Sequence, residues 1–248
     1  MKKSISILFL LSMLLFPKDY ALIVGISGYK NIGTLSHIES DIETYKNILN
    51  QRGINRVTIL TNAQATRAEI RNYLAYVMED MKRFKNNRFF MFFAGHGIDT
   101  KYLEYDEQIL KSGVEEYLTD SGVFLPYEYD ERNIPNTIII GKRDLRPYLI
   151  EIDKYIQESL IIFDACYSGN IIRGEKRITP FIYSNSKDYP YKNIVYIASA
   201  TPKEKGESGV LSVILNKCIT QNTHLEKLRV CMNNELKSIG QRVTLISK

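Results

Sequence analysis

Several residue types are scarce in this 248-residue chain, and each scarcity excludes a class of protein. Three cysteines are too few for a disulfide-rich scaffold or a zinc ribbon. Three histidines leave few ways to build a metal site from nitrogen and sulfur ligands. Seven prolines and fourteen glycines are too few for a disordered or collagen-like chain. Outside the N-terminus, no apolar run approaches the roughly 18 residues of a membrane-spanning helix.

The charge of the chain is also modest, because 33 basic and 28 acidic residues leave a net charge of +5. Nucleic-acid binding requires a clustered basic stripe, which the sequence lacks, so we expect no nucleic-acid partner. Hydrophobic residues make up 44% of the chain, enough to bury a core. The length, with no low-complexity linker, predicts one domain over residues 20–248.

The first 19 residues have the pattern of a targeting segment. Two lysines precede a 12-residue apolar run from Ile5 to Phe16, which is the size of a signal-peptide core and too short to span a bilayer. We expect residues 1–19 to be a signal peptide and the protein to be exported, to a periplasm or outside the cell. No good small-x-small cleavage triplet precedes Tyr20, so an uncleaved membrane tether or a buried first element stays an alternative.

Apolar strands and amphipathic helices alternate along the rest of the chain. Two capping boxes, Ser36-x-x-Glu39 and Thr66-x-x-Glu69, predict helix starts, whereas residues 98–136 are predicted to be a long loop. The alternation predicts an α/β fold with a mainly parallel central sheet of about six strands and helices on both faces. The predicted strands are Tyr20–Ile26, Val57–Leu60, Arg88–Ala94, Thr137–Ile140, Leu160–Asp164, Ile194–Ser199 and Val243–Ile246. The later predicted helices are Arg143–Gln157, 208–219 and 224–239.

Two predicted core strands end in reactive residues with glycines nearby. His96 lies between Gly95 and Gly97, and Cys166 comes two residues after a strand that ends at Asp164. Parallel strands would bring both residues to one edge of the sheet, where ligands of open α/β sheets bind. A free thiol is mostly protonated at neutral pH, so a neighbouring imidazole supplies the base that it needs. We therefore expect nucleophilic catalysis here, although a single Cys or His is more often structural.

These two motifs resemble those of caspase-like cysteine peptidases, the clan of caspases, metacaspases and paracaspases. Gly-His-Gly over 95–97 and Asp-Ala-Cys-Tyr-Ser-Gly over 164–169 occur in the order typical of the clan and are most similar to its metacaspase side. The resemblance covers about residues 20–246 and includes Gly209–Leu215, which is similar to a helix start of the family. It implies a caspase-like three-layer sandwich.

The resemblance also implies a role for each residue at these strand ends. Cys166 would be the nucleophile and His96 the general acid and base, while the backbone N–H groups of Gly97 and Cys166 would hold the oxyanion. Asp164 and Asp41 match two carboxylates of the S1 pocket in metacaspase-like members. They imply protein or peptide substrates with Arg or Lys at P1. The alternatives are compensation of helix charge by Asp41 and hydrogen bonds from loop amides to Asp164.

The segment after His96 is strongly acidic, because residues 98–131 contain ten Asp or Glu and two Lys. Such a segment can be a solvated loop or can attract basic substrates. We expect no cofactor and no metal in the site. Some metacaspases bind calcium through clustered aspartates, so calcium binding by Asp99, Asp106 and Asp120 stays an alternative, although their spacing matches no EF-hand loop.

The sequence leaves the other two cysteines and one basic loop open to two interpretations each. Cys218 and Cys231 can pair in an oxidising compartment or stay buried thiols. Arg173, Lys176 and Arg177 follow the expected nucleophile, where they can solvate a loop or serve as sites of self-cleavage. The main competing function is a catalytically silent caspase-like binding or scaffold module. A nucleotide-binding protein is a weaker alternative, because the glycines after the first strand do not fit a phosphate-binding motif.

Overall fold

A six-stranded sheet forms the middle layer of the protein, in the order β2-β1-β3-β7-β8-β9. The computed structural model describes residues 17–119, 121–165, 190–198, 210–221, 225–237 and 244–246. The first five strands of the order are parallel, and β9 pairs antiparallel with β8. The strands are β1 (Asp19–Gly25), β2 (Thr58–Thr61), β3 (Asn87–Ala94), β7 (Ile156–Asp164), β8 (Tyr196–Ala198) and β9 (Thr244–Ile246).

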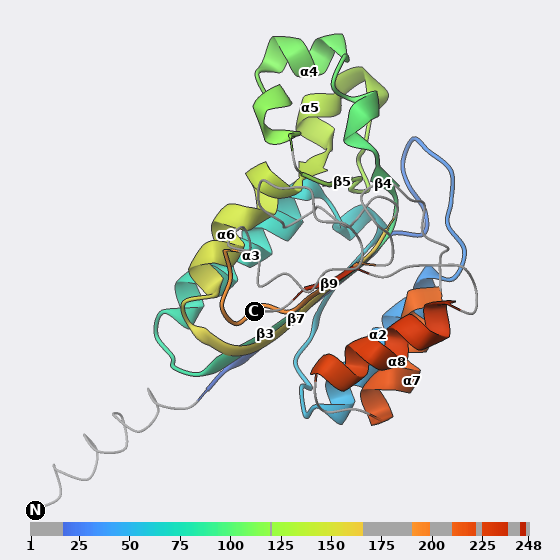
Figure 1. Cartoon of the computed structure of the whole chain (residues 1–248). Helices are drawn as coiled ribbons and strands as arrows, with labels where there is room; N and C mark the ends of the chain where they lie inside the picture. Colours follow the sequence, from blue (N-terminus) through green and yellow to red (C-terminus); the bar gives the residue numbers. More distant parts are fainter. Residues whose placement is uncertain are drawn as a thin grey trace, which may run out of the picture.

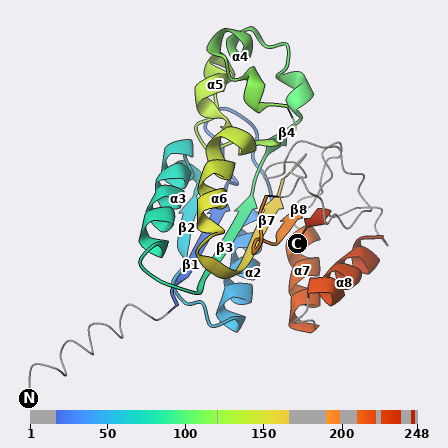
Figure 2. The ribbon, with the colours of Figure 1, turned by 60° about the vertical axis from the view of Figure 1, so that its left-hand side comes forward.

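Helices cover both faces of this sheet (Figures 1 and 2). Two helices, α3 and α6, pack on one face, while α2, α7 and α8 pack on the other. The expected three-layer α/β sandwich is therefore confirmed. None of the helices in the described ranges is long and apolar enough to cross a membrane. The helices that cover the sheet are α2 (Ile38–Gln51), α3 (Arg67–Met81), α6 (Arg146–Ile152), α7 (Val210–Gln221) and α8 (Leu225–Lys237).

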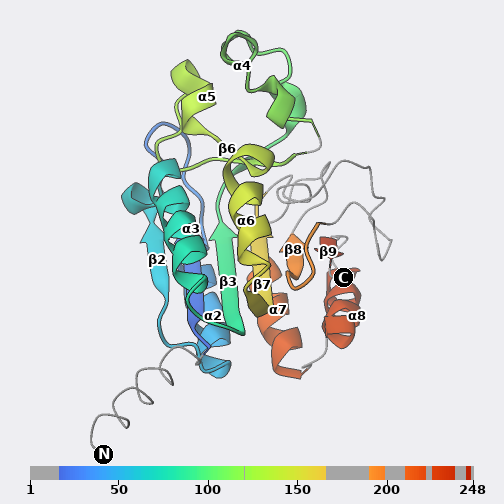
Figure 3. The ribbon, with the colours of Figure 1, turned by 90° about the vertical axis from the view of Figure 1, so that its left-hand side faces the viewer.

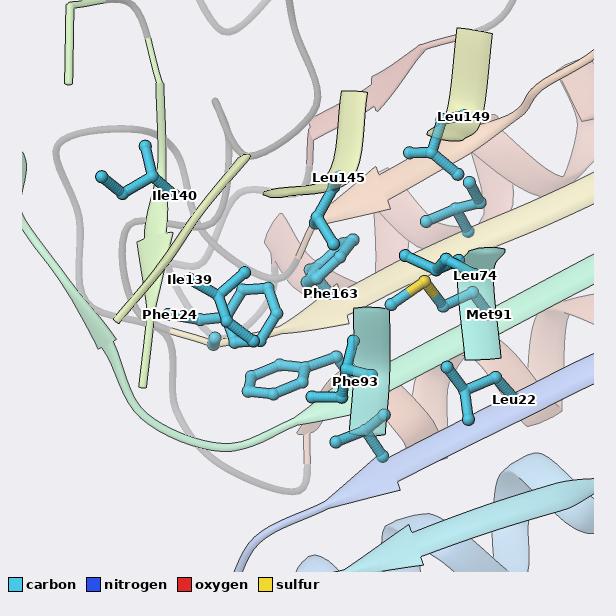
Figure 4. Close-up of a cluster of buried hydrophobic side chains, with 14 of the residues drawn as sticks. Leu22, Leu74, Met91, Phe93, Phe124, Ile139, Ile140, Leu145, Leu149 and Phe163 are labelled. Carbon is cyan, nitrogen blue, oxygen red and sulfur yellow. The ribbon is translucent and has the colours of Figure 1, made fainter. Parts of the chain in front are cut away.

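Side chains of the central strands alternate between the two helical layers, which is why these strands are nearly continuous apolar runs. In β3, Met91 and Phe93 face the layer of α3 and α6, whereas Phe92 faces the layer of α2 and α7. The Phe93 ring meets Phe124, with ring centroids 4.1 Å apart, and Phe163 of β7 lies beside them (Figure 4). The core therefore extends up to the carboxyl ends of β3 and β7.

The segment over 98–136 is not the long loop that the sequence predicts. It contains short helices and strands, and it forms a lobe at one end of the molecule (Figure 3). Three strands make a separate antiparallel sheet in this lobe: β4 (Gly97–Ile98), β5 (Val123–Phe124) and β6 (Ile139–Ile140). Elements of two to six residues are too short to show a hydrophobic period, so the sequence pattern missed β4, β5 and the short helices of the lobe. The predicted strand over Thr137–Ile140 contains β6, which lies in this separate sheet rather than in the central one. The lobe's other elements are η2 (Thr100–Tyr102), α4 (Glu107–Ser112), η3 (Glu115–Tyr117), η4 (Glu131–Asn133) and α5 (Ile134–Thr137).

One of the two predicted capping boxes is confirmed and the other is wrong. Thr66 caps α3, because its side-chain oxygen accepts the backbone N–H of Glu69 at 3.1 Å. The box at Ser36 is wrong, since the N-cap of α2 is His37, in the left-handed conformation with φ 73°. Glu39 does not complete a box there, because its carboxylate accepts a hydrogen bond from the Ser27 hydroxyl instead.

Helix α6 is shorter than the predicted helix over Arg143–Gln157. A π-helical turn, η5 (Gly141–Leu145), precedes it, and the first residues of β7 replace its expected end. The buried carboxylate of Asp144 explains the altered start, because it accepts the backbone N–H of Ile140 at 2.9 Å and pairs with Arg143. Side-chain contacts of this kind compete with the regular helical pattern.

A disulfide joins α7 to α8 through Cys218 and Cys231, whose Cα atoms lie 5.7 Å apart. The sequence left pairing and free thiols as alternatives, and the structure contains the pair. The bond connects two helices of the same layer, so it fixes the packing of α8 against α7.

Candidate active site

The carboxyl ends of three neighbouring strands meet at the edge of the sheet where the candidate site lies. Ala94 of β3 pairs with Gly25 of β1 on one side and with Asp164 of β7 on the other. His96 follows β3 by two residues, and the N–H of Gly95 donates to the Asp164 carbonyl at 3.2 Å. The sheet therefore brings His96 and the end of β7 to one edge. Cys166, the expected nucleophile two residues after Asp164, lies outside the described residues.

The backbone of His96 is held on two sides. Its N–H donates to the hydroxyl oxygen of Tyr29 at 2.6 Å, and its carbonyl accepts the N–H of Leu125 at 2.9 Å. A Cβ atom at Gly95 would lie 2.6 Å from the same tyrosine hydroxyl, so only glycine fits beneath it. Tyr29 therefore approaches the chain closely because residue 95 lacks a side chain.

The imidazole of His96 has one nitrogen directed at a backbone carbonyl. Nε2 lies 3.3 Å from the carbonyl oxygen of Gly33, which can only accept a hydrogen bond. This contact requires the proton on Nε2 and leaves Nδ1 able to take a proton from another group. Burial lowers the pKa of His96 below its ordinary value, and the Gly33 carbonyl opposes that shift. The neutral ring is thus favoured, which is the form a general base needs.

The loop that carries Tyr29 and Gly33 is tied to the sheet by Asn62. Its side-chain oxygen accepts the backbone N–H groups of Ser27 and Gly28, both at 3.0 Å. Asn62 has φ 43°, a conformation that asparagine adopts more readily than most residues. Sequence reasoning missed both Tyr29 and Asn62. Each stands in a turn without periodicity, and only the turn-forming character of Asn62 gave a local signal.

The two predicted S1 carboxylates lie on the same side of the sheet. Asp41 is in the first turn of α2, and Asp164 ends β7 on the face that α2 and α7 cover, since it alternates with Ile162. Both carboxylates are buried, with Asp41 1% and Asp164 6% exposed. The hydroxyl of Tyr45 lies near both, and their negative charges add to burial in raising the pKa of that tyrosine.

Asp41 has one satisfied and one unsatisfied oxygen. The hydroxyl of Ser212, on the first turn of α7, donates to Oδ1, whereas Oδ2 is buried with no hydrogen-bond partner in the described part of the chain. Burial raises the pKa of Asp41, and the Ser212 hydrogen bond opposes this shift. A buried carboxylate with unused acceptor capacity fits a cationic group.

The remaining predicted residues occupy simpler positions. Gly97 begins β4, directly after His96. The side chains of Asp99 and Asp106 cap short helices of the lobe, each by accepting backbone N–H groups. Asp120 lies outside the described residues, and within them no three His, Cys, Asp or Glu side chains are grouped to hold a metal ion.

A three-layer α/β sandwich with a mainly parallel sheet is the architecture that the resemblance to caspase-like proteins implies. The profile of the caspase domain, peptidase C14, matches residues 18–244, so the chain belongs to the caspase-domain family. The metacaspase-1 of Ajellomyces capsulatus (strain NAm1 / WU24) is 27% identical over 208 residues, which cover 79% of this chain. The match spans 50% of that relative, so this chain covers half of its length.

A solved structure shares the fold. Protein GSU0716 from Geobacter sulfurreducens superposes with a TM-score of 0.61 over 92% of both chains, at 16% sequence identity. At this identity the likeness shows the fold alone. The predicted resemblance to caspases and metacaspases is thus confirmed at the level of family and fold.

Proposed function

We propose that this protein is a cysteine endopeptidase in which Cys166 is the nucleophile and His96 the general acid and base. The observation that carries the proposal is the anchored imidazole of His96, with Nε2 3.3 Å from the Gly33 carbonyl and Nδ1 left for proton transfer. It stands at the edge of the sheet where β7 leads into Cys166, and the chain belongs to the caspase-domain family.

The reaction then takes the usual course of acyl transfer to a thiol. Nδ1 of His96 takes the proton of the Cys166 thiol, and the resulting thiolate adds to the substrate carbonyl, while the backbone N–H groups of Gly97 and Cys166 stabilise the oxyanion. Collapse of this intermediate breaks the C–N bond while His96 gives its proton to the leaving amine. Water, deprotonated by His96, hydrolyses the thioester and restores the thiol.

The specificity that we propose is for Arg or Lys at P1. Two buried carboxylates, Asp41 and Asp164, would line the S1 pocket, and buried carboxylates require a cation or protonation. A P1 aspartate would add a third negative charge to this environment. The free energy of binding therefore favours basic side chains, with Arg better suited to bidentate pairing.

The first test is hydrolysis of short fluorogenic peptides by the wild type, Cys166→Ala and His96→Ala. We expect Cys166→Ala to abolish hydrolysis and His96→Ala to reduce kcat by orders of magnitude, with unchanged thermal unfolding. Lys46→Ala, on the exposed side of α2, is the matched control. Equal activity of the wild type and Cys166→Ala would reject the peptidase assignment and leave the silent scaffold module as the better description.

The second test compares peptides that differ only at P1. We expect Arg to be cleaved better than Lys and Asp to be rejected. Asp164→Asn should lower kcat/KM for Arg peptides, because it removes one of two buried charges facing the cation. The loss of transition-state stabilisation should be about a few kcal/mol. Preferential cleavage after Asp would show that these carboxylates do not form the pocket.

We also propose self-processing after Arg173, Lys176 or Arg177, which lie outside the described residues between two core strands. The fragments should stay associated, because β7, which precedes the cut, pairs with β8, which follows it. Mass spectrometry of wild type beside Cys166→Ala tests this. Cuts in both proteins would identify a contaminating protease, and a fully active intact wild type would show that processing is unnecessary.

Export of the protein is a further part of the proposal. The Cys218–Cys231 disulfide supports it, since such bonds persist in oxidising compartments. Fractionation of cells that produce the full chain, with thiol alkylation before lysis, tests this. We expect an exported protein in which Cys218 and Cys231 resist alkylation; a cytosolic protein with both cysteines alkylated would contradict it.

A further inference from the structure

The chain enters the folded domain at the amino ends of the parallel strands, with almost no linker. The backbone N–H and carbonyl of Lys18 both form hydrogen bonds with residues of β3, each 3.1 Å long. Asp19 accepts two hydrogen bonds from the guanidinium of Arg88, both 2.7 Å long. Only Pro17 therefore separates the apolar run over Ile5–Phe16 from a part of the chain that is fixed to the sheet.

The end of the molecule around this entry point carries an excess of positive charge. We call it the amino edge, and it lies opposite the lobe toward which the strands β2 and β3 point (Figure 3). The amino edge contains nine basic and six acidic residues, whereas residues 98–131 of the lobe contain two basic and ten acidic residues. The molecule is therefore positive at one end and negative at the other. Five segments form the amino edge: residues 17–19, 51–57, 79–88, 151–158 and 190–195.

Three exposed cations of the amino edge have no carboxylate partner among the described residues. They are Arg56, Lys85 and Lys192, and each lies in the segment that precedes a strand. Every acidic residue of the edge, in contrast, forms an ion pair or accepts backbone N–H groups. The half-buried ring of Phe84 lies beside Lys85 in sequence, with the Lys18 ammonium 5.2 Å from its centroid. Unpaired cations next to an aromatic ring suit contact with anionic lipid headgroups.

The apolar run and the amino edge are too close together to act independently. A single residue such as Pro17 spans at most about 3.6 Å, whereas charges interact over about 8 Å at physiological ionic strength. An apolar run that enters a bilayer would therefore bring the amino edge within range of the headgroup charges. The run of 12 residues is too short to span a bilayer, and one short apolar anchor binds only marginally. Stable attachment takes a second signal, and a basic surface is one that serves.

We propose that residues 1–19 stay on the mature protein and that the amino edge binds anionic lipid headgroups, so that the two parts together hold the domain on a membrane. Removal of residues 1–19 would delete the hydrogen bonds that Lys18 and Asp19 form with β3. The same orientation directs the acidic lobe and the candidate active site away from the like charge of the bilayer. The inference concerns location, so it does not depend on the proposed peptidase activity.

The first test measures binding of the full chain to sedimented vesicles of phosphatidylcholine, alone or with about one third phosphatidylglycerol. The triple variant Arg56→Gln, Lys85→Gln and Lys192→Gln should bind the anionic vesicles at least about tenfold more weakly than the wild type. Both proteins should bind the neutral vesicles equally, because the apolar run is unchanged. Added salt should weaken the binding of the wild type to anionic vesicles toward that of the variant.

The matched control removes the same charge from the opposite end of the molecule. Lys101→Gln, Lys111→Gln and Arg132→Gln change three exposed cations of the lobe, and this triple variant should bind both kinds of vesicle as the wild type does. Acetylation of the wild type, followed by mass spectrometry, adds a measurement that needs no variant. On anionic vesicles Lys85 and Lys192 should be protected, whereas the lobe lysines should react as they do in solution.

Equal binding of the wild type and the amino-edge variant to anionic vesicles would overturn the inference, as would an equal loss in the lobe variant. A mature N-terminus at or beyond Tyr20, found by mass spectrometry of the protein isolated from cells, would overturn it too. Retention on duplex DNA with no preference for anionic vesicles would assign the surface to nucleic acid instead. Each of these results leaves the peptide-cleavage assays, and with them the proposed function, unaffected.

Discussion

The hydroxyl oxygen of Tyr29 lies 2.6 Å from the backbone nitrogen of His96 and accepts its N–H. The centroids of the tyrosine ring and the imidazole are 4.9 Å apart. One side chain therefore holds both the backbone and the ring of His96, from a loop 67 positions earlier in the chain. The position of the imidazole depends on that loop as much as on the strand that carries it.

Tyr29→Phe should lower kcat about tenfold with little change in KM, because the His96 N–H loses its acceptor and the imidazole its fixed position. The free energy of unfolding should fall by about 1 kcal/mol. Steady-state kinetics on an Arg peptide and urea unfolding measure the two effects. Tyr76→Phe, at a side chain 54% exposed, is the control. An unchanged kcat in Tyr29→Phe would show that the contact does not position His96.

Gly95→Ala should destabilise the fold by about 1–3 kcal/mol and reduce activity. The added methyl would lie 2.6 Å from the Tyr29 hydroxyl and 2.9 Å from the Phe93 ring. Urea unfolding should show partial recovery in the double variant with Tyr29→Phe, since one of the two clashes is gone. Gly33→Ala is the control, because nothing lies within 4 Å of a Cβ there. Equal stability of both alanine variants would contradict the clash.

Ser212→Ala should weaken cleavage of Arg peptides about three- to tenfold, mainly through KM. The change removes the hydrogen bond to Asp41 that opposes the effect of burial, so the pKa of Asp41 rises further and its charge is less available. Kinetics at several pH values measure this, with a larger loss expected at acidic pH. Ser40→Ala, on the exposed side of α2, is the control. A pH-independent loss would indicate a packing effect instead.

The acid limb of kcat/KM should have its midpoint below pH 6.5, the ordinary pKa of histidine. Burial lowers the pKa of His96, so the neutral base persists to more acidic pH than in a free imidazole. Protonation then removes the base, and the rate falls as pH falls through this lowered value. A pH-rate profile in a buffer of constant ionic strength measures the limb. A midpoint above 6.5 would indicate that a nearby negative charge stabilises the imidazolium.

Much of the fold was predictable because buried parallel strands are continuous apolar runs, as in β3 and β7. The sequence also predicted that His96 and the end of β7 lie at one edge of the sheet, because parallel strands have their carboxyl ends at the same edge. The capping box at Ser36 failed because Glu39 binds Ser27, a contact between segments that no local pattern contains. Tyr29 was missed for the same reason, since its partner His96 follows another strand.

The hydrogen bond between Asp41 and Ser212 joins residues 171 positions apart. A ribosome delivers the N-terminal half of a chain first, so Asp41 emerges long before α7 exists. The candidate S1 pocket therefore reaches its final form only after most of the polypeptide has been synthesised. A chain that ends before Ser212 lacks the hydroxyl that donates to the buried carboxylate of Asp41.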